Sequence, residues 1–78
     1  QPHEAVRRLV AHRMGREEKI ITKLRGLGAA TIEDLVPFAY DEVPKQLHRM
    51  ASRSLLAHLL KLKTDGRAVE QDGRWRMV

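Results

Sequence analysis

The chain has 78 residues, a formal net charge of +5 and no cysteine. This length is enough for one small domain, and the lack of cysteine excludes disulfides and thiolate chemistry. No apolar run approaches the roughly 20 residues that a membrane-spanning helix needs, so we expect no membrane contact and a cytoplasmic location. The sequence begins with Gln1 rather than Met, and we therefore expect it to be part of a longer protein.

The first segment reads as an amphipathic helix over residues 4–14, with Val6, Leu9 and Val10 on one face. This face is too far upstream to reach the core of the domain that follows. We therefore expect residues 1–15 to form a linker helix that docks on something outside the domain, and residues 16–78 to form the domain itself. Gly15 leaves two alternatives open, because a single helix could cross it at a cost of about 1 kcal/mol relative to Ala, or two helices could meet there.

A second helix is predicted to begin at Thr31, because Thr31 and Asp34 have the spacing of a capping box. Pro37 lacks a backbone N–H, so this helix should be short or kinked. Its apolar face is formed by Ile32, Leu35 and Val36, and we expect Phe38 and Tyr40 to fill the core beside it.

The longest helix is predicted within residues 44–66, since neither Gly nor Pro interrupts the sequence between Lys45 and Asp65. One apolar stripe faces the core; it is formed by Leu47, Ala51, Leu55, His58 and Leu62. Leu56 and Leu60 lie on the opposite side in the C-terminal half. We therefore expect that half to be buried nearly all round, and the N-terminal half to keep an exposed basic face.

A β-hairpin is predicted after Gly66, and two registers are possible. A two-residue turn at Asp72 and Gly73 would place Glu70 opposite Trp75. A three-residue loop over residues 71–73 would instead place Val69 opposite Trp75. We prefer the second register because it collects Val69, Trp75 and Met77 on one face.

No residues have the spacing expected of an active site. The four histidines form neither an HxH nor an HExxH arrangement, and we interpret His58 as a hydrogen-bonded core residue rather than a metal ligand. We therefore expect no catalytic residue, no metal and no bound cofactor in this chain.

The order of helix, helix, long helix and hairpin predicts a mainly α winged helix-turn-helix with a small β-hairpin, preceded by the linker helix. In this fold the N-terminal half of the last helix can enter the major groove of DNA. The candidate nucleic-acid-binding residues are Lys45, Arg49 and Arg53 of the long helix, with Arg74 and Arg76 of the wing. The same fold also serves for protein contacts, so the fold alone does not decide the function.

Three strings carry a family resemblance: HRMGREEKI at residues 12–20, TIEDLV at 31–36 and LHRMASRSLLAHLLKLKTDGRA at 47–68. Together they resemble the C-terminal winged-helix domain of metallo-β-lactamase-fold hydrolases, a group that includes an endoribonuclease. The resemblance implies that a catalytic domain of the same protein precedes this segment and holds zinc through an HxHxDH motif, which is absent here. It also implies that Val6, Leu9 and Val10 would dock on that domain.

Our hypothesis is a non-catalytic accessory domain of such a hydrolase, which shapes the substrate side and contacts RNA or DNA. One alternative is a free-standing DNA-binding winged helix of a transcription regulator. Another is a structural cap that touches no substrate.

Overall fold

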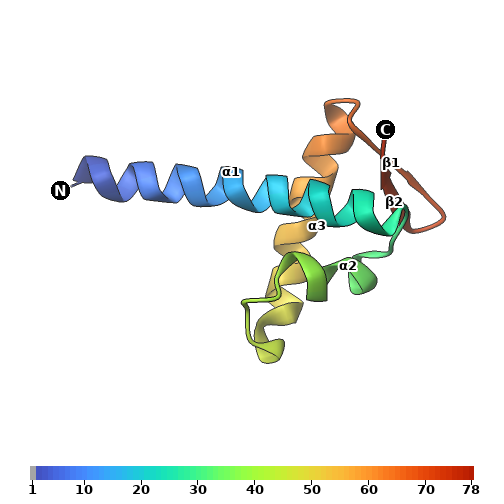
Figure 1. Ribbon diagram of the computed structural model, residues 1–78, viewed down its shortest axis with the longest axis horizontal. Coiled ribbons are helices and arrows are strands. Elements are labelled where there is room, and N and C mark those ends of the chain that lie inside the picture. The colour runs from blue at the N-terminus through green and yellow to red at the C-terminus, as the bar shows by residue number, and fades with distance from the viewer. Residues whose placement is uncertain (1) are drawn as a thin grey trace.

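The computed structural model describes the backbone of residues 2–78 and the side chains of residues 15–78. Three α-helices and a hairpin follow one another along the chain (Figure 1). They are α1 (Pro2–Leu27), α2 (Ile32–Ala39), the short 3-10 helix η1 (Lys45–Leu47), α3 (His48–Thr64), β1 (Ala68–Gln71) and β2 (Arg74–Met77). This arrangement confirms the predicted winged helix.

Helix α1 passes through Gly15 without a break and projects well beyond the rest of the domain (Figure 1). Of the two alternatives left open by the sequence, the structure therefore has one long helix, and the expected linker is continuous with the first helix of the domain. The side chains of Val6, Leu9 and Val10 lie outside the described residues. Their docking on another domain, and the boundary at residue 15, stay predictions.

Helix α2 begins where the sequence predicts. The Thr31 hydroxyl accepts a hydrogen bond from the backbone N–H of Asp34 at 3.1 Å, which is the expected N-terminal cap. The helix contains Pro37 and has only eight residues, so it is short. The prediction for Phe38 is wrong: Leu35, Val36 and Ala39 occupy the buried side of α2, and Phe38 lies on its outer side, 48% exposed.

Helix α3 has distinct structures at its two ends. Its first turn is 3-10, so Leu47 lies at the N-cap position and is exposed instead of facing the core. At the other end Gly66 has a φ of 74°, its N–H donates to Lys63 O, and the N–H of Arg67 donates to Leu62 O. These two bonds form a Schellman motif, which satisfies carbonyls that the end of the helix would otherwise leave free.

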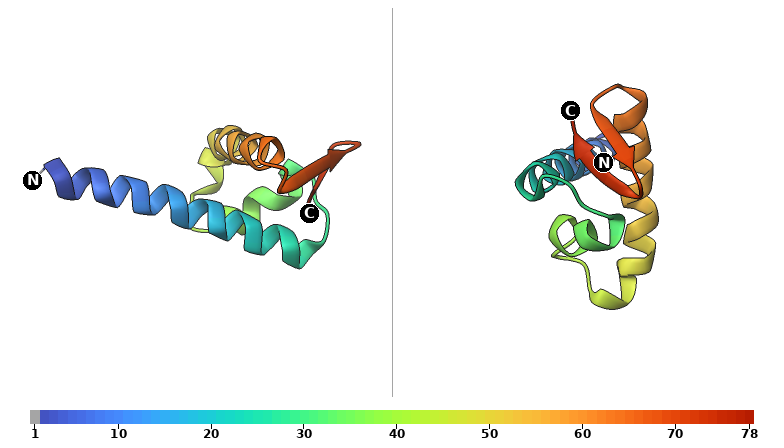
Figure 2. Two further views of the ribbon diagram at one scale, coloured as in Figure 1. Left: turned by 90° about the horizontal axis from the view of Figure 1, so that it is seen from above. Right: turned by 90° about the vertical axis from the view of Figure 1, so that its right-hand side faces the viewer.

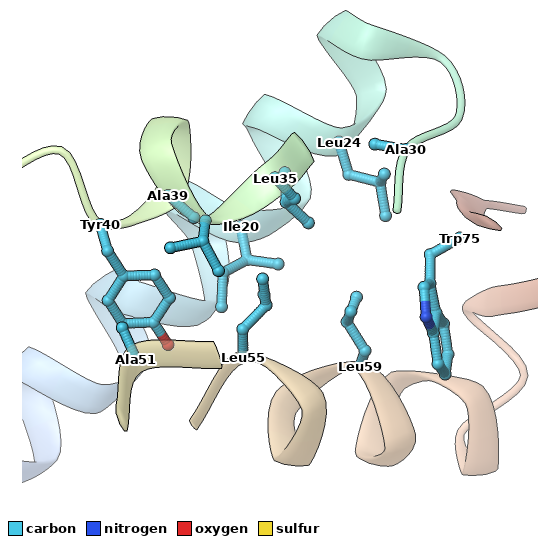
Figure 3. Close-up of a cluster of buried hydrophobic side chains, with 11 residues drawn as sticks. Ile20, Leu24, Ala30, Leu35, Ala39, Tyr40, Ala51, Leu55, Leu59 and Trp75 are labelled. Atoms are coloured by element: carbon cyan, nitrogen blue, oxygen red, sulfur yellow. The ribbon is translucent and has the colours of Figure 1, made fainter. Parts of the chain in front are cut away.

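The core is formed where α3 packs against α1, α2 and the wing. Ala51, Leu55, Leu59 and Leu62 form the buried face of α3. Figure 3 shows Leu55 and Leu59 pointing toward the side chains of α1 and α2, with Trp75 at one end of the cluster and Tyr40 at the other. The partners that α1 and α2 supply to these leucines are Ile20, Leu24 and Leu35.

The expectation that the C-terminal half of α3 is buried nearly all round is wrong. Leu56 and Leu60 are 37% and 47% exposed, because α1, α2 and the wing all pack on one side of α3 (Figure 2). His58 lies at the edge of the buried face rather than in the core, since its side chain keeps 20% of its exposure. Leu59, and not His58 as predicted, lies at the centre of the buried face of α3.

The hairpin has the register that we did not prefer. Ala68 pairs with Met77, Val69 with Arg76, Glu70 with Trp75 and Gln71 with Arg74. The turn consists of Asp72 and Gly73, with φ values of 53° and 80°. Positive φ at both central residues is typical of the type I′ turn, whose twist matches that of the two strands.

The inner face of the hairpin is apolar in this register too, without Val69. Ala68 takes its place beside Trp75 and Met77, and it is buried against Leu62 and Ile21. Directly opposed residues share a face of the hairpin, so Val69 lies on the outer face. Glu70 lies on the same face as Trp75, at the exposed tip.

Two glycines provide a matched test of these backbone assignments. A Cβ added at Gly15 contacts nothing and the residue lies within a helix, so Gly15→Ala should raise the free energy of unfolding by up to about 1 kcal/mol. Gly73 has a left-handed φ, so Gly73→Ala should lower it by about 1 kcal/mol. Urea denaturation followed by the fluorescence of the single Trp75 measures both changes.

Gly73→Asn is the control, because Asn tolerates the left-handed region better than Ala does. A stabilising Gly73→Ala would contradict the type I′ turn, and a strongly destabilising Gly15→Ala would contradict the continuous α1.

Candidate nucleic-acid interface

The outer face of η1 and α3 is positively charged and lacks carboxylates. Lys45, Arg49 and Arg53 are all exposed, and no Asp or Glu occurs between residues 44 and 64. None of the three cations forms an ion pair with a carboxylate of residues 15–78. These guanidinium and ammonium groups are therefore free to bind an anion.

Two leucines interrupt the basic outer face of α3 in its C-terminal half. Arg49, Arg53, Leu56 and Leu60 follow one another at helical spacings of four, three and four residues, so they form one outer stripe. The first two positions are cationic, and the last two are the half-exposed leucines. Leu56 and Leu60 therefore separate Arg49 and Arg53 from the next position of the stripe, the exposed Lys63.

The wing forms a second, separate basic group. Arg74 and Arg76 alternate with the buried Trp75 along β2, so both lie on the outer face of the hairpin, and both are exposed. The wing adjoins the C-terminal end of α3, whereas Arg49 lies at the N-terminal end (Figure 1). From Arg53 to the end of α3 is about 16 Å at 1.5 Å per residue. The five predicted cations therefore form two groups and not one patch.

Arg16 of α1 has contacts that sequence reasoning missed. Its guanidinium donates to the carbonyl oxygen of Ala39, the last residue of α2, and pairs with the carboxylate of Glu42. It also lies over the Tyr40 ring, 4.4 Å from the centroid. The side chain is only 11% exposed. A cation at the C-terminal end of a helix satisfies its free carbonyls, so Arg16 fastens α1 to the end of α2.

Glu17, the next residue of α1, forms contacts with α3. Its carboxylate accepts from the Lys61 ammonium at 3.2 Å and lies 3.8 Å from His58 Nδ1. The Glu17 side chain is 17% exposed. His58 therefore faces a carboxylate at the α1–α3 contact, and this position explains its inward placement without a metal. The uninterrupted run of polar residues at 16–19 was the feature of the sequence that could have indicated these contacts, because the apolar periodicity of the helix does not explain it.

A third contact joins α1 to the turn before η1. The Lys19 ammonium donates to the carboxylates of Asp41 and Glu42. The hydrogen bond from Lys19 lowers the pKa of Asp41 below its ordinary value. Charged side chains at positions 16, 17 and 19 thus join α1 to α2, α3 and the turn between them.

Within residues 15–78, no group of three or more His, Asp or Glu side chains is positioned to hold a metal ion. The expectation of zinc in a separate catalytic domain stays a prediction. No described helix is long and apolar enough to cross a membrane.

The sequence matches a protein-family model. Residues 31–75 match the model described as "Beta-lactamase associated winged helix domain". The match covers more than half of the chain and takes in α2, α3 and the wing as far as Trp75. It confirms the resemblance that the sequence strings indicated.

The contacts of Arg16 predict a loss of stability on its removal. Arg16→Met should lower the free energy of unfolding by about 1–3 kcal/mol, because a hydrogen bond to the Ala39 carbonyl and a cation–π contact are lost. Arg16→Lys keeps the charge but not the planar group. Its free energy of unfolding should therefore lie between those of Arg16→Met and wild type. An unchanged urea midpoint for Arg16→Met would contradict the proposed attachment of α1.

Acidification tests the contact between Lys19 and Asp41. Because the folded-state pKa of Asp41 is lowered, the contact stabilises the fold above the ordinary Asp pKa of about 3.9 and is lost as the pH falls through the lowered pKa. Asp41→Asn should therefore slightly lower the urea midpoint at pH 7.

The difference from wild type should be smaller at pH 2 than at pH 7. Glu18→Gln is the control, because Glu18 is exposed and pairs with no cation of residues 15–78. An equal deficit for Asp41→Asn at both pH values would contradict this account.

Proposed function

The chain belongs to the family of beta-lactamase associated winged helix domains, and from this premise we propose that it is the non-catalytic C-terminal accessory domain of a zinc-dependent metallo-β-lactamase-fold hydrolase. Its role is to shape the substrate side of the enzyme by contacting a nucleic-acid substrate. The catalytic domain of the same protein is its partner, and the other partner is RNA or DNA.

One observation carries the nucleic-acid part of this proposal. The exposed face of η1 and the first half of α3 presents Lys45, Arg49 and Arg53, with no carboxylate on either element. The charged side chains at positions 16, 17 and 19 instead pair with oppositely charged residues of α3 and of the turn after α2, and they stabilise the fold. Three cations without carboxylate partners among residues 15–78 therefore lie together on the surface that a winged helix presents to a nucleic acid.

The chemistry of this surface suits phosphate contacts more than base stacking. Tyr40 and Trp75 are buried, and the exposed Phe38 belongs to α2, not to the basic face. Without an aromatic platform on the basic face, single-strand stacking contributes little. Arg and Lys neutralise phosphates and release counterions, so the affinity should depend steeply on salt.

The basic face predicts a specific change in salt dependence. We would titrate the chain with fluorescein-labelled duplex DNA, duplex RNA and single-stranded RNA between 50 and 200 mM salt, and compare wild type with Arg49→Gln and Arg53→Gln. Each substitution removes one phosphate contact, so it should lower the slope of log K against log[salt] by about 0.7–0.9.

Arg25→Gln is the matched control, because it removes the same charge from the exposed surface of α1, on the other side of the domain from α3 (Figure 2). If all three variants changed the slope equally, the binding would reflect net charge and not this face. If wild type bound none of the three nucleic acids at 50 mM salt, the domain would be a structural cap. If it bound one DNA sequence in preference to others, the result would favour a transcription regulator.

A further inference from the structure

The outer face of the wing is built from residues that point away from the core. Trp75 and Ala68 are buried on the inner face, so the opposite face holds Arg74 and Arg76 of β2 and Val69 and Gln71 of β1. Val69 lies opposite Arg76, and Gln71 lies opposite Arg74. The hairpin thus presents two arginines in a row beside one aliphatic and one amide side chain.

The loop between α1 and α2 extends this face on the other side of β2. Ala30 pairs with Trp75 through two backbone hydrogen bonds of 2.8 and 3.0 Å, so the loop runs beside β2 like a third short strand. Because Ala30 and Trp75 both face the core, the neighbouring Ala29 lies on the outer face. Its small side chain leaves open space beside the longer arginines.

An open hollow of about 340 Å³ lies at this position. Its lining brings together the loop, both strands and the turn, and consists of Ala29, Val69, Gln71, Asp72, Arg74 and Arg76. Neither arginine forms an ion pair with a carboxylate of residues 15–78. Two arginines without carboxylate partners among the described residues and one glutamine therefore line the hollow.

We propose that this hollow binds a phosphate group of the nucleic acid, as a site separate from the basic face of α3. Side chains two residues apart on a strand are about 6–7 Å apart at their bases, so two long arginines can converge on one anion between them. Guanidinium groups match the geometry of phosphate oxygens and bind them through paired hydrogen bonds. The identity of the ligand rests on the proposed function, whereas the anion site rests on the wing alone.

Asp72 opposes this binding, and its position makes the proposal testable. Asp72 lines the same hollow, and its negative charge repels a phosphate bound there. Asn supports a type I′ turn as well as Asp does. Asp72→Asn should therefore preserve the hairpin, remove the repulsion and tighten binding, which is the opposite effect to that of losing an arginine.

The test uses a short single-stranded RNA in two forms, with a 5′-phosphate and with a 5′-hydroxyl, and inorganic phosphate as competitor. Binding by the 78-residue chain is measured by fluorescence anisotropy at 50 mM salt. Arg74→Gln and Arg76→Gln should each weaken binding about threefold, and Asp72→Asn should tighten it about twofold. Glu70→Gln is the matched control, because Glu70 lies on the same hairpin but on the other face and does not line the hollow.

Effects confined to the 5′-phosphate RNA, with competition by millimolar phosphate, would identify a terminal phosphate as the ligand. Equal effects on both RNAs would identify an internal phosphate of the RNA backbone as the ligand. Either result supports the site. Two results would overturn it: arginine variants that bind like wild type, or Asp72→Asn and Glu70→Gln variants that tighten binding equally, since the latter would reflect net charge alone.

The basic face of α3 is tested in the same assay with Arg49→Gln. If this variant bound like wild type while the wing variants behaved as expected, the α3 part of the proposed function would fail and the wing site would stand. If only Arg49→Gln weakened binding, the wing site would fail and the α3 face would stand. The Trp75 fluorescence of each variant confirms that its wing is folded.

Discussion

The packing of one face of α3 is the constraint on which the rest of the structure depends. Leu55, Leu59 and Leu62 are fully buried, and α1, α2 and the wing each contact them or their neighbours. Burial of a leucine side chain contributes about 2 kcal/mol relative to exposure. Because one side of α3 supplies this packing, its other side stays free. The helix therefore serves both as the centre of the core and as the surface available to a partner.

The division of charges follows from the same arrangement. Charged residues near the middle of α1 meet partners on α2, on α3 and in the turn between them, so they fix the direction in which α1 leaves the domain (Figure 1). Exposed ion pairs contribute little to stability, but Arg16 and Glu17 are largely covered, and they act on two different elements. The cations of η1, the first half of α3 and the wing have no such partners among residues 15–78. We attribute structural roles to the first set and binding roles to the second.

Much of the fold could be predicted from local rules. The cap at Thr31, the shortness of α2 around Pro37 and the end of α3 at Gly66 each follow from the backbone chemistry of one residue. Such features are independent of what packs nearby. The family strings extended this prediction to nearly the whole chain, and the family-model match confirmed it over residues 31–75.

The errors arose where packing decides between equivalent patterns. Leu56 and Leu60 have the same apolar character as Leu55 and Leu59, and only the placement of α1 and α2 on one side of α3 determines which pair is buried. The wing register failed for a similar reason. Val69 is the more hydrophobic residue, but the type I′ turn places the smaller Ala68 against the core.

The basic residues show a comparable limit at the candidate site. Their number and their position in the sequence could be predicted, but not their separation into two groups. That separation depends on the length of α3 and on the fact that the wing adjoins its far end (Figure 1). The hollow beside Arg74 and Arg76 could not be predicted either, because Ala29 reaches it only through the pairing of Ala30 with Trp75.

The most direct test of the central claim is a map of the bound surface. Backbone amide signals of the ¹⁵N-labelled chain would be followed by NMR while single-stranded RNA or duplex DNA is added at low salt. Our account predicts that the largest shifts fall at residues 45–53 and in the wing around Arg74 and Arg76, with small shifts in α2. Largest shifts in α2 around the exposed Phe38, or in the charged segment at residues 16–19, would contradict the assignment of binding to the free face of α3.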